Sequence, residues 1–156
     1  MVEYSKIAVI GAGPAGLLTS LFVKNIDVDI YEEHDGVGKP KHWAGCVGED
    51  TAKFYTSIFG QDIVVGRYDT LIFHTPIGVY KLVFNKPIIY RLNRPILEDR
   101  LLDKIHGKGL NVFFKSKVKP GGKAGSIIVN STEKNYDLVV VAEGAYSKFR
   151  SKYIGR

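Results

Sequence analysis

The sequence predicts an α/β fold in which a parallel sheet forms the middle of three layers and carries an additional antiparallel β section. A short apolar segment, a glycine-rich turn, a segment of helical periodicity and a second β-type segment follow one another within residues 6–32. A continuous apolar segment of the same kind covers residues 138–142. Because parallel strands joined through one helix need a right-handed crossover, the opening predicts a β-α-β unit.

The first strand is predicted at residues 6–10 and the first helix from Pro14 to about residue 25. Pro14 suits the first turn of a helix, where its missing N–H has no partner to lose. The other expected elements are a second strand at 27–32, a glycine-rich, ligand-contacting loop at 34–49, a helix at 50–59, an antiparallel section at 63–92, a helix at 95–106, a sheet strand at 111–114, a hairpin formed by 115–119 and 126–130, and a strand at 138–142 buried on both faces.

Composition indicates one soluble domain covering residues 1–156. The formal net charge is +6, but the basic residues are scattered, which favours a solvated surface over a nucleic-acid interface. No apolar run approaches the ~20 residues of a membrane span, and the first strand leaves no room for a signal peptide. The single cysteine, Cys46, excludes an internal disulfide, so we expect a cytoplasmic protein. The four histidines lack metal-ligand spacing and are expected to be surface or hydrogen-bonded residues, so no metal site is expected.

The turn after the first strand contains the main candidate binding motif of the sequence, formed by Gly11, Ala12, Gly13, Pro14, Ala15 and Gly16. This G-x-G-x-x-G pattern, placed between a strand and a helix, is typical of a Rossmann-like site for a dinucleotide such as FAD or NAD(P). Gly11 permits a tight turn, Gly13 lets the backbone approach a pyrophosphate, and Gly16 lets the helix pack closely on the strand. Glu32 lies 19 residues after Gly13, where its carboxylate can accept ribose hydroxyls and would repel a 2′-phosphate.

Four segments together resemble one family. The G-x-G-P-A-G turn is similar to that of FAD-dependent enzymes, and residues 94–101 resemble the R-x-x-(F/L)-(D/E)-x-x-L helix start of flavoproteins related to p-hydroxybenzoate hydroxylase. Residues 137–150 resemble the D-x-V-V-x-A-D-G-x-x-S-x-x-R segment of the same proteins. Residues 38–48 are similar to the G-x-P-x-H-C-x-G-x-V-(G/S) loop of the geranylgeranyl reductase branch. The resemblance covers the chain in the right order.

The resemblance implies the N-terminal FAD-binding part of a geranylgeranyl-reductase-like oxidoreductase, a family that saturates isoprenoid double bonds in lipid precursors. Arg94 would approach the pyrophosphate or ribityl chain, Val118 would meet the adenine through its backbone, and Glu143 with Gly144 would support the cofactor. Besides the glycine turn, the implied cofactor-binding set comprises Glu32, Glu33, Lys39, Gly45, Arg94, Val118, Ala142, Glu143 and Gly144.

Three departures limit this reading. The family's loop cysteine aligns with Trp43, whereas Cys46 lies three positions later, so these two are only weak catalytic candidates. Glu143 replaces the family's aspartate. The relatives are also much longer, so we expect the C-terminal substrate half to be lacking, with the flavin site completed by a second polypeptide, by a homo-oligomer partner or by nothing at all. An isoprenoid lipid substrate and peripheral membrane association then follow from the resemblance. A non-catalytic or degenerate binder of FAD, NAD or ADP and a small NAD-dependent enzyme remain the alternatives.

Overall fold

The computed structural model describes residues 4–39, 44–144 and 147–153. Its internal contacts divide the chain into two compact units. The first unit comprises Met1–Lys39 with Leu101–Arg156, and the second comprises Pro40–Arg100. The boundary falls within helix α3 (Arg94–Gly107), and the expectation of one domain over residues 1–156 stays a prediction.

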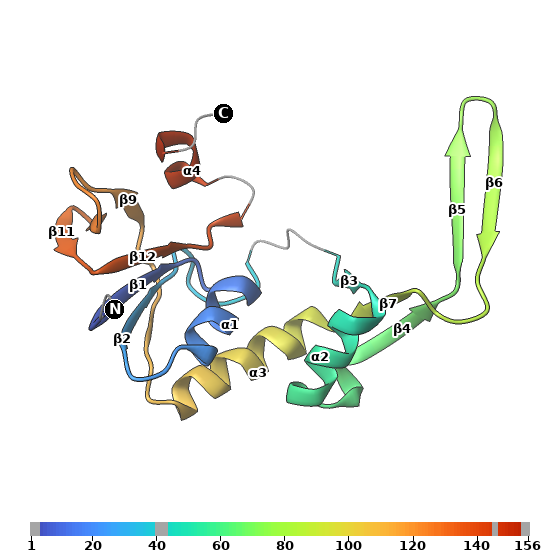
Figure 1. The fold of residues 1–156 in the computed structure, drawn as a ribbon, viewed down its shortest axis with the longest axis horizontal. Helices are drawn as coiled ribbons and strands as arrows, with labels where there is room; N and C mark the ends of the chain where they lie inside the picture. Colours follow the sequence, from blue (N-terminus) through green and yellow to red (C-terminus); the bar gives the residue numbers. More distant parts are fainter. Residues whose placement is uncertain (1–3, 40–43, 145–146, 154–156) are drawn as a thin grey trace. The chain divides into compact units, whose positions relative to one another are not determined.

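A four-stranded parallel sheet forms the middle of the first unit (Figure 1). It contains, in spatial order, β12 (Leu138–Val141), β1 (Lys6–Ile10), β2 (Asp27–Tyr31) and β8 (Val112–Phe113). Helix α1 (Pro14–Phe22) connects β1 to β2, so the predicted β-α-β opening and the predicted α/β class are confirmed.

Helix α1 ends at Phe22, earlier than the expected end near residue 25. Val23 already has an extended backbone, with φ −66° and ψ 137°, and Asn25 has a left-handed φ of 58°. The side chain of Lys108 donates hydrogen bonds to the carbonyl oxygens of Ser20, Leu21 and Val23. These carbonyls lie in and just after the last turn of α1, so Lys108, which directly follows α3, stabilises the early end of α1.

A three-stranded antiparallel meander covers one face of the parallel sheet. It consists of β9 (Val118–Pro120), β10 (Ser126–Val129) and β11 (Thr132–Asn135). Its residues Val118, Ile127 and Val129 form one buried cluster with Ala8 and Ile10 of β1. Val9 points to the opposite face of the sheet and faces Gly16 of α1, which places the helix on the other side. The three predicted layers are therefore α1, the parallel sheet and the meander.

Two details of these strands differ from the sequence-based expectations. The expected hairpin formed by residues 115–119 and 126–130 is present as β9 and β10, but a third strand, β11, follows it. Strand β12 was expected to be buried on both faces, and this prediction is wrong, because Leu138 is 41% and Val141 is 42% exposed. The reason is position, since β12 lies at the edge of the described sheet and pairs with β1 alone.

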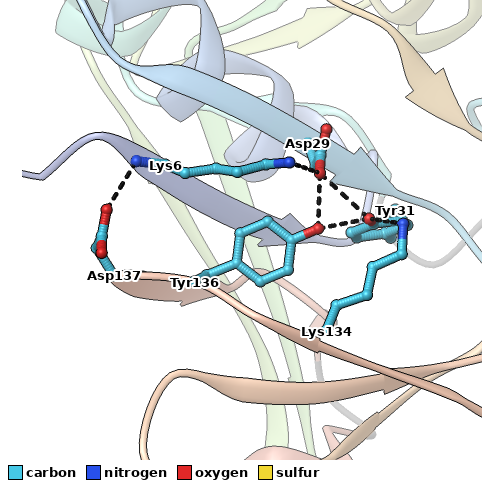
Figure 2. A network of polar contacts seen from close by, with 6 residues as sticks. All are labelled: Lys6, Asp29, Tyr31, Lys134, Tyr136 and Asp137. Atoms are coloured by element: carbon cyan, nitrogen blue, oxygen red, sulfur yellow. Dashed lines mark hydrogen bonds and ion pairs between the residues drawn. The ribbon is translucent and has the colours of Figure 1, made fainter.

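A chain of hydrogen bonds links the meander side of the first unit to the parallel sheet (Figure 2). Tyr136 donates to Asp29 at 2.6 Å, its hydroxyl lies 2.6 Å from that of Tyr31, and the Tyr31 hydroxyl also donates to Asp29 at 3.4 Å. Lys134 donates to Tyr31 at 3.0 Å, and Lys6 lies 3.2 Å from Asp29. Burial raises the pKa of Asp29, but hydrogen bonds from Tyr136 and Lys6 outweigh it, so the pKa lies below its usual value. Burial also raises the pKa of Tyr136.

Asp137 joins the start of β12 to the start of β1. Its Oδ2 accepts hydrogen bonds from the backbone N–H groups of Lys6 and Ser5 and from the Ser5 hydroxyl, each at 2.8 Å. The backbone bonds from Lys6 and Ser5 hold the pKa of this carboxyl below its usual value. The ionised form is therefore favoured by folding.

This clamp predicts a pH-dependent stability. Because the folded pKa of Asp137 is lowered, its contribution is complete above the unfolded pKa and is lost as the pH falls through the folded pKa. We expect Asp137→Ala to be less stable than wild type in urea unfolding at pH 7, and the difference to shrink below pH ~4, the usual carboxyl range. Asp103→Ala, at an exposed position of α3, serves as the control. A difference that stays constant between pH 7 and pH 3 would contradict the role of the charge.

The second unit contains the expected antiparallel section. Helix α2 (Glu49–Phe59) and a 3₁₀ turn (Gln61–Ile63, η1) precede it. The sheet has the order β3 (Cys46–Val47), β7 (Ile89–Leu92) and β4 (Val64–Tyr68), and all its pairs are antiparallel. The prediction for residues 63–92 is confirmed, and those for the helices at 50–59 and 95–106 are confirmed within one residue at each end.

A separate hairpin of β5 (Thr70–Thr75) and β6 (Gly78–Val83) completes the second unit (Figure 1). The strand register places Phe73 opposite Tyr80 and Leu71 opposite Leu82, so these four side chains share one face. Phe73, Tyr80 and Leu82 are each about half exposed. In the described residues of either unit, no helix is long and apolar enough to cross a membrane.

Candidate functional site

Two of the three motif glycines are required by packing within the first unit. A Cβ on Gly16 would lie 1.9 Å from the carbonyl oxygen of Gly11, so only glycine lets α1 approach the turn. A Cβ on Gly11 would lie 2.5 Å from the carbonyl oxygen of Ala142, and Gly11 also has a φ of +101°. These two contacts explain the first and last glycines without any ligand.

Gly13 has no such internal reason. A Cβ at this position would meet no atom within 4 Å, and the backbone, with φ −74° and ψ 176°, is one that any residue can adopt. Gly13 is the N-cap of α1, and no side chain caps the helix there. The first helical hydrogen bond runs from Leu17 to Gly13, so the N–H groups of Ala15 and Gly16 have no acceptor within the helix. The turn thus combines open space with a positive helix end.

Helix α2 provides a comparison. Its N-cap, Gly48, has nearly the same backbone conformation, with φ −75° and ψ 172°, and also has no atom within 4 Å of an added Cβ. However, Glu49 and Asp50 occupy the first turn of α2, whereas the first turn of α1 holds no acidic residue. Acidic side chains already neutralise the positive end of α2, so the α1 end is the better place for an external anion.

Glu32 lies next to this turn, as predicted. Its Oε2 accepts a hydrogen bond of 2.8 Å from the backbone N–H of Ala12, which ties the end of β2 to the glycine turn. Its Oε1 accepts from the backbone N–H of His34 at 3.0 Å and lies 2.6 Å from Nδ1 of the same residue. The side chain of Glu32 is only 11% exposed. The carboxylate lies where it was expected, but its Oε1 is already bonded to His34.

The last apolar strand brings a second motif to the same place. The backbone N–H of Ala142 donates to Ile10 at 2.8 Å, so the segment Ala142–Gly144 begins beside the glycine turn. The carboxylate of Glu143 accepts from the Ser147 hydroxyl at 2.6 Å and from the backbone of Phe149 at 3.3 Å, at the start of α4 (Lys148–Tyr153). Glu143 therefore caps a short helix, and Gly144 is exposed with a φ of +73°.

The remaining candidates of the first unit have ordinary surroundings. Glu33 is exposed, and the exposed Lys39 forms an ion pair of 3.0 Å with Asp35, four residues before it in the loop. Val118 is 5% exposed and belongs to the cluster beneath the meander, with its backbone in register with Val129 of β10.

The second unit contains the other candidates. Gly45 and Arg94 lie together, because a Cβ on Gly45 would be 3.2 Å from Cγ of Arg94 and 2.8 Å from the carbonyl oxygen of Leu92. The guanidinium of Arg94 is paired with Glu98 at 2.8 Å, and these side chains are 11% and 3% exposed. Cys46 is exposed at the start of β3, and Trp43 lies outside the described residues.

Sequence reasoning missed His34 as a neighbour of Glu32. The only available signal was its place two residues after a carboxylate at a strand end, a spacing that brings side chains of an extended segment to one side. In the part of the chain that the structure describes, no group of three potential ligands could hold a metal ion.

Comparison with solved structures identifies the fold. FqzB matches 97% of this chain with a TM-score of 0.70 at 20% identity. CtdE in complex with FAD matches 99% with a TM-score of 0.68 at 19% identity. A geranylgeranyl bacteriochlorophyll reductase-like protein from Thermoplasma acidophilum matches 90% with a TM-score of 0.68 at 18% identity. This chain has their fold.

The matches are limited to part of each neighbour. The chain covers 39% of FqzB, 42% of CtdE and 40% of the Thermoplasma acidophilum protein. It therefore spans about two fifths of the solved structures that it resembles. No protein-family model matches the sequence, and no curated protein matches it significantly.

Proposed function

We propose that the first unit binds the ADP half of FAD, as the cofactor-binding part of an oxidoreductase. The observation that carries the proposal is Gly13. It is a glycine that the fold does not need, and it stands at the uncapped, positive end of α1 with open space before it. A pyrophosphate fits such a site because it is an anion that accepts backbone hydrogen bonds.

Each neighbouring group then has a role in binding. The N–H groups of Ala15 and Gly16 would donate to the pyrophosphate, and Glu32 would accept from the ribose of the adenosine. The close contact of Gly11 with Ala142 would hold the turn in shape. The flavin ring of FAD supplies hydride or electron transfer when it is bound and shielded. Glu33, Lys39, Gly45, Arg94, Val118, Glu143 and Gly144 remain proposed contacts of the same cofactor.

The reaction class is a finer part of the proposal. The loop at residues 38–48 resembles that of geranylgeranyl reductases, and the Thermoplasma acidophilum neighbour carries a related name. We therefore propose reduction of isoprenoid double bonds, in the cytoplasm or at a membrane surface. The chain covers about 40% of that neighbour, and the contribution of a second polypeptide or a homo-oligomer partner to the flavin and substrate sites is part of the same proposal.

A non-catalytic dinucleotide binder is the second candidate. Two observations favour it: the carboxylate of Glu143 caps α4, and the guanidinium of Arg94 is paired with Glu98. Both side chains have partners within the protein, so neither is needed at a flavin. Binding of the ADP half depends on Gly13 and Glu32 and is common to both candidates.

Calorimetric titration of the purified chain with FAD, ADP, NAD and FMN tests the proposal. We expect FAD and ADP to bind and FMN, which lacks the adenosine half, to bind far more weakly. Binding of FMN as tight as that of FAD would overturn the assignment to the adenosine half. Reduction of bound flavin by dithionite, followed by assay of an isoprenoid substrate, separates the enzyme from the simple binder.

Glu32→Ala is expected to weaken ADP and FAD binding by about 1–3 kcal/mol, because a buried acceptor of charged hydrogen bonds is lost. The affinity is measured by the same titration, and thermal unfolding reports any loosening of the turn that Glu32 holds through Ala12. Asp103→Ala, an exposed carboxylate of α3, is the control. If Glu32→Ala binds ADP as tightly as wild type, Glu32 does not contact the ribose.

A further inference from the structure

The carboxylate of Glu32 has one acceptor position left. An ionised carboxylate offers about four lone-pair positions on its two oxygens. The Ala12 N–H takes one on Oε2, and the backbone N–H of His34 takes one on Oε1. The imidazole of His34, in the tautomer whose Nδ1 carries the proton, donates to Oε1 and takes the other position there. A ribose with two adjacent hydroxyls would bring two donors to a single free position.

The backbone of His34 is fixed on both sides of this contact. Its N–H is bound to Glu32, and its carbonyl oxygen accepts from the N–H of Lys115 at 2.9 Å. The N–H of Ser116 donates to the carbonyl of Glu32 at 2.8 Å, and the N–H of Glu32 donates to Phe113 at 3.0 Å. The segment after β8 therefore holds residues 32–34 in place. Only the imidazole, whose side chain is 36% exposed, is free to leave the carboxylate.

The relative strengths of the two kinds of bond indicate which group keeps Oε1. The contact between Nδ1 and Oε1 is short, at 2.6 Å, and the pair is largely shielded on the Glu32 side. A ribose hydroxyl is a neutral donor that would replace one hydrogen bond to the carboxylate by another, while leaving the imidazole without this partner. The exchange gains little, so we expect His34 to remain on Oε1 when a nucleotide binds.

We propose that His34 sets how Glu32 recognises the adenosine ribose, an inference that rests on the proposed nucleotide site. With the imidazole on Oε1, the carboxylate accepts one ribose hydroxyl through the free position of Oε2 and does not accept the second. His34 is thus a specificity-determining residue: it makes the site tolerant of a ribose that lacks one of its two hydroxyls. Without the imidazole, Glu32 accepts both hydroxyls.

Titration with ADP, 2′-deoxy-ADP and 3′-deoxy-ADP tests this inference. For the wild-type chain we expect one deoxy analogue to bind within about twofold of ADP and the other to bind about fivefold to tenfold more weakly, the value of one hydrogen bond. For His34→Ala we expect both analogues to lose about fivefold to tenfold relative to ADP. His34→Asn, whose side-chain amide can replace Nδ1–H, should restore the wild-type pattern.

The outcomes separate the inference from the proposed function. If the wild-type chain binds ADP but both deoxy analogues lose affinity equally, or if His34→Ala leaves the pattern unchanged, His34 does not control recognition, and the nucleotide site stands. If the folded wild-type chain does not bind ADP, both proposals are overturned. His106→Ala, at an exposed position in the last turn of α3, is the matched control and should retain the wild-type pattern.

Discussion

Gly13→Ala is expected to lower the affinity for ADP and FAD at least tenfold while leaving the protein folded. The added Cβ meets no atom of the protein within 4 Å, so it occupies the space proposed for the pyrophosphate. The pyrophosphate can then no longer approach the backbone closely, so it loses hydrogen bonds from the N–H groups at the start of α1. A tenfold loss corresponds to about 1.4 kcal/mol. Calorimetric titration measures the affinity, and urea unfolding measures the stability.

Gly48→Ala is the matched control for this substitution. Gly48 and Gly13 are both N-caps with nearly equal backbone angles and open surroundings. We therefore expect alanine to lower the stability of the two helices by similar amounts, each no more than about 1 kcal/mol. The two variants should therefore show similar unfolding free energies, but only Gly13→Ala should lose nucleotide affinity. Equal affinities of the two variants would remove Gly13 from the site.

Among alanine substitutions of the glycines in the turn, Gly16→Ala is expected to lower the free energy of unfolding the most. Its Cβ would lie 1.9 Å from the carbonyl oxygen of Gly11 and 3.2 Å from Cγ1 of Val9. The backbone of Gly11 cannot retreat, because Gly11 itself packs against Ala142. Overpacking costs about 1–3 kcal/mol, and a contact with fixed backbone places Gly16→Ala at the upper end of this range.

Urea unfolding of Gly16→Ala measures this cost, and Gly122→Ala, at a glycine with no atom within 4 Å of an added Cβ, is its control. We expect the control to differ little from wild type. The comparison with Gly13→Ala is also informative, since one motif glycine should affect stability and the other should affect binding. A Gly16→Ala variant as stable as Gly122→Ala would show that α1 does not pack on the turn as described.

The elements with local signals could be predicted from the sequence. Pro14 and the glycine turn define the start of α1, and the turn residues between 63 and 92 define the antiparallel strands. Strand β11 (Thr132–Asn135) was missed because a strand with four polar residues has no apolar alternation. The exposure of β12 was missed because an apolar run does not reveal whether its strand has one neighbour or two.

The candidate site was predictable in part for a similar reason. Glu32 follows a strand at the spacing that the glycine turn demands, so its position next to Ala12 could be expected. The bond between His34 and Glu32 could not, since a histidine two residues beyond a strand is compatible with many side-chain directions. The role of Glu143 in capping α4 depends on where the chain turns after β12, and sequence spacing alone does not define that turn.

Strand β1 lies between β2 and β12, and this position affects the order in which the domain can form during synthesis. Its first partner is close in sequence, but Lys6 and Asp137 are 131 residues apart. At a translation rate of roughly 5–20 residues per second, β1 waits roughly 7–26 seconds for its second partner. Throughout that time one edge of the central strand is unpaired, and an unpaired edge binds other extended segments. Slower translation near residue 137 would therefore favour misassembly, and a chaperone that covers strand edges would be most useful before β12 leaves the ribosome.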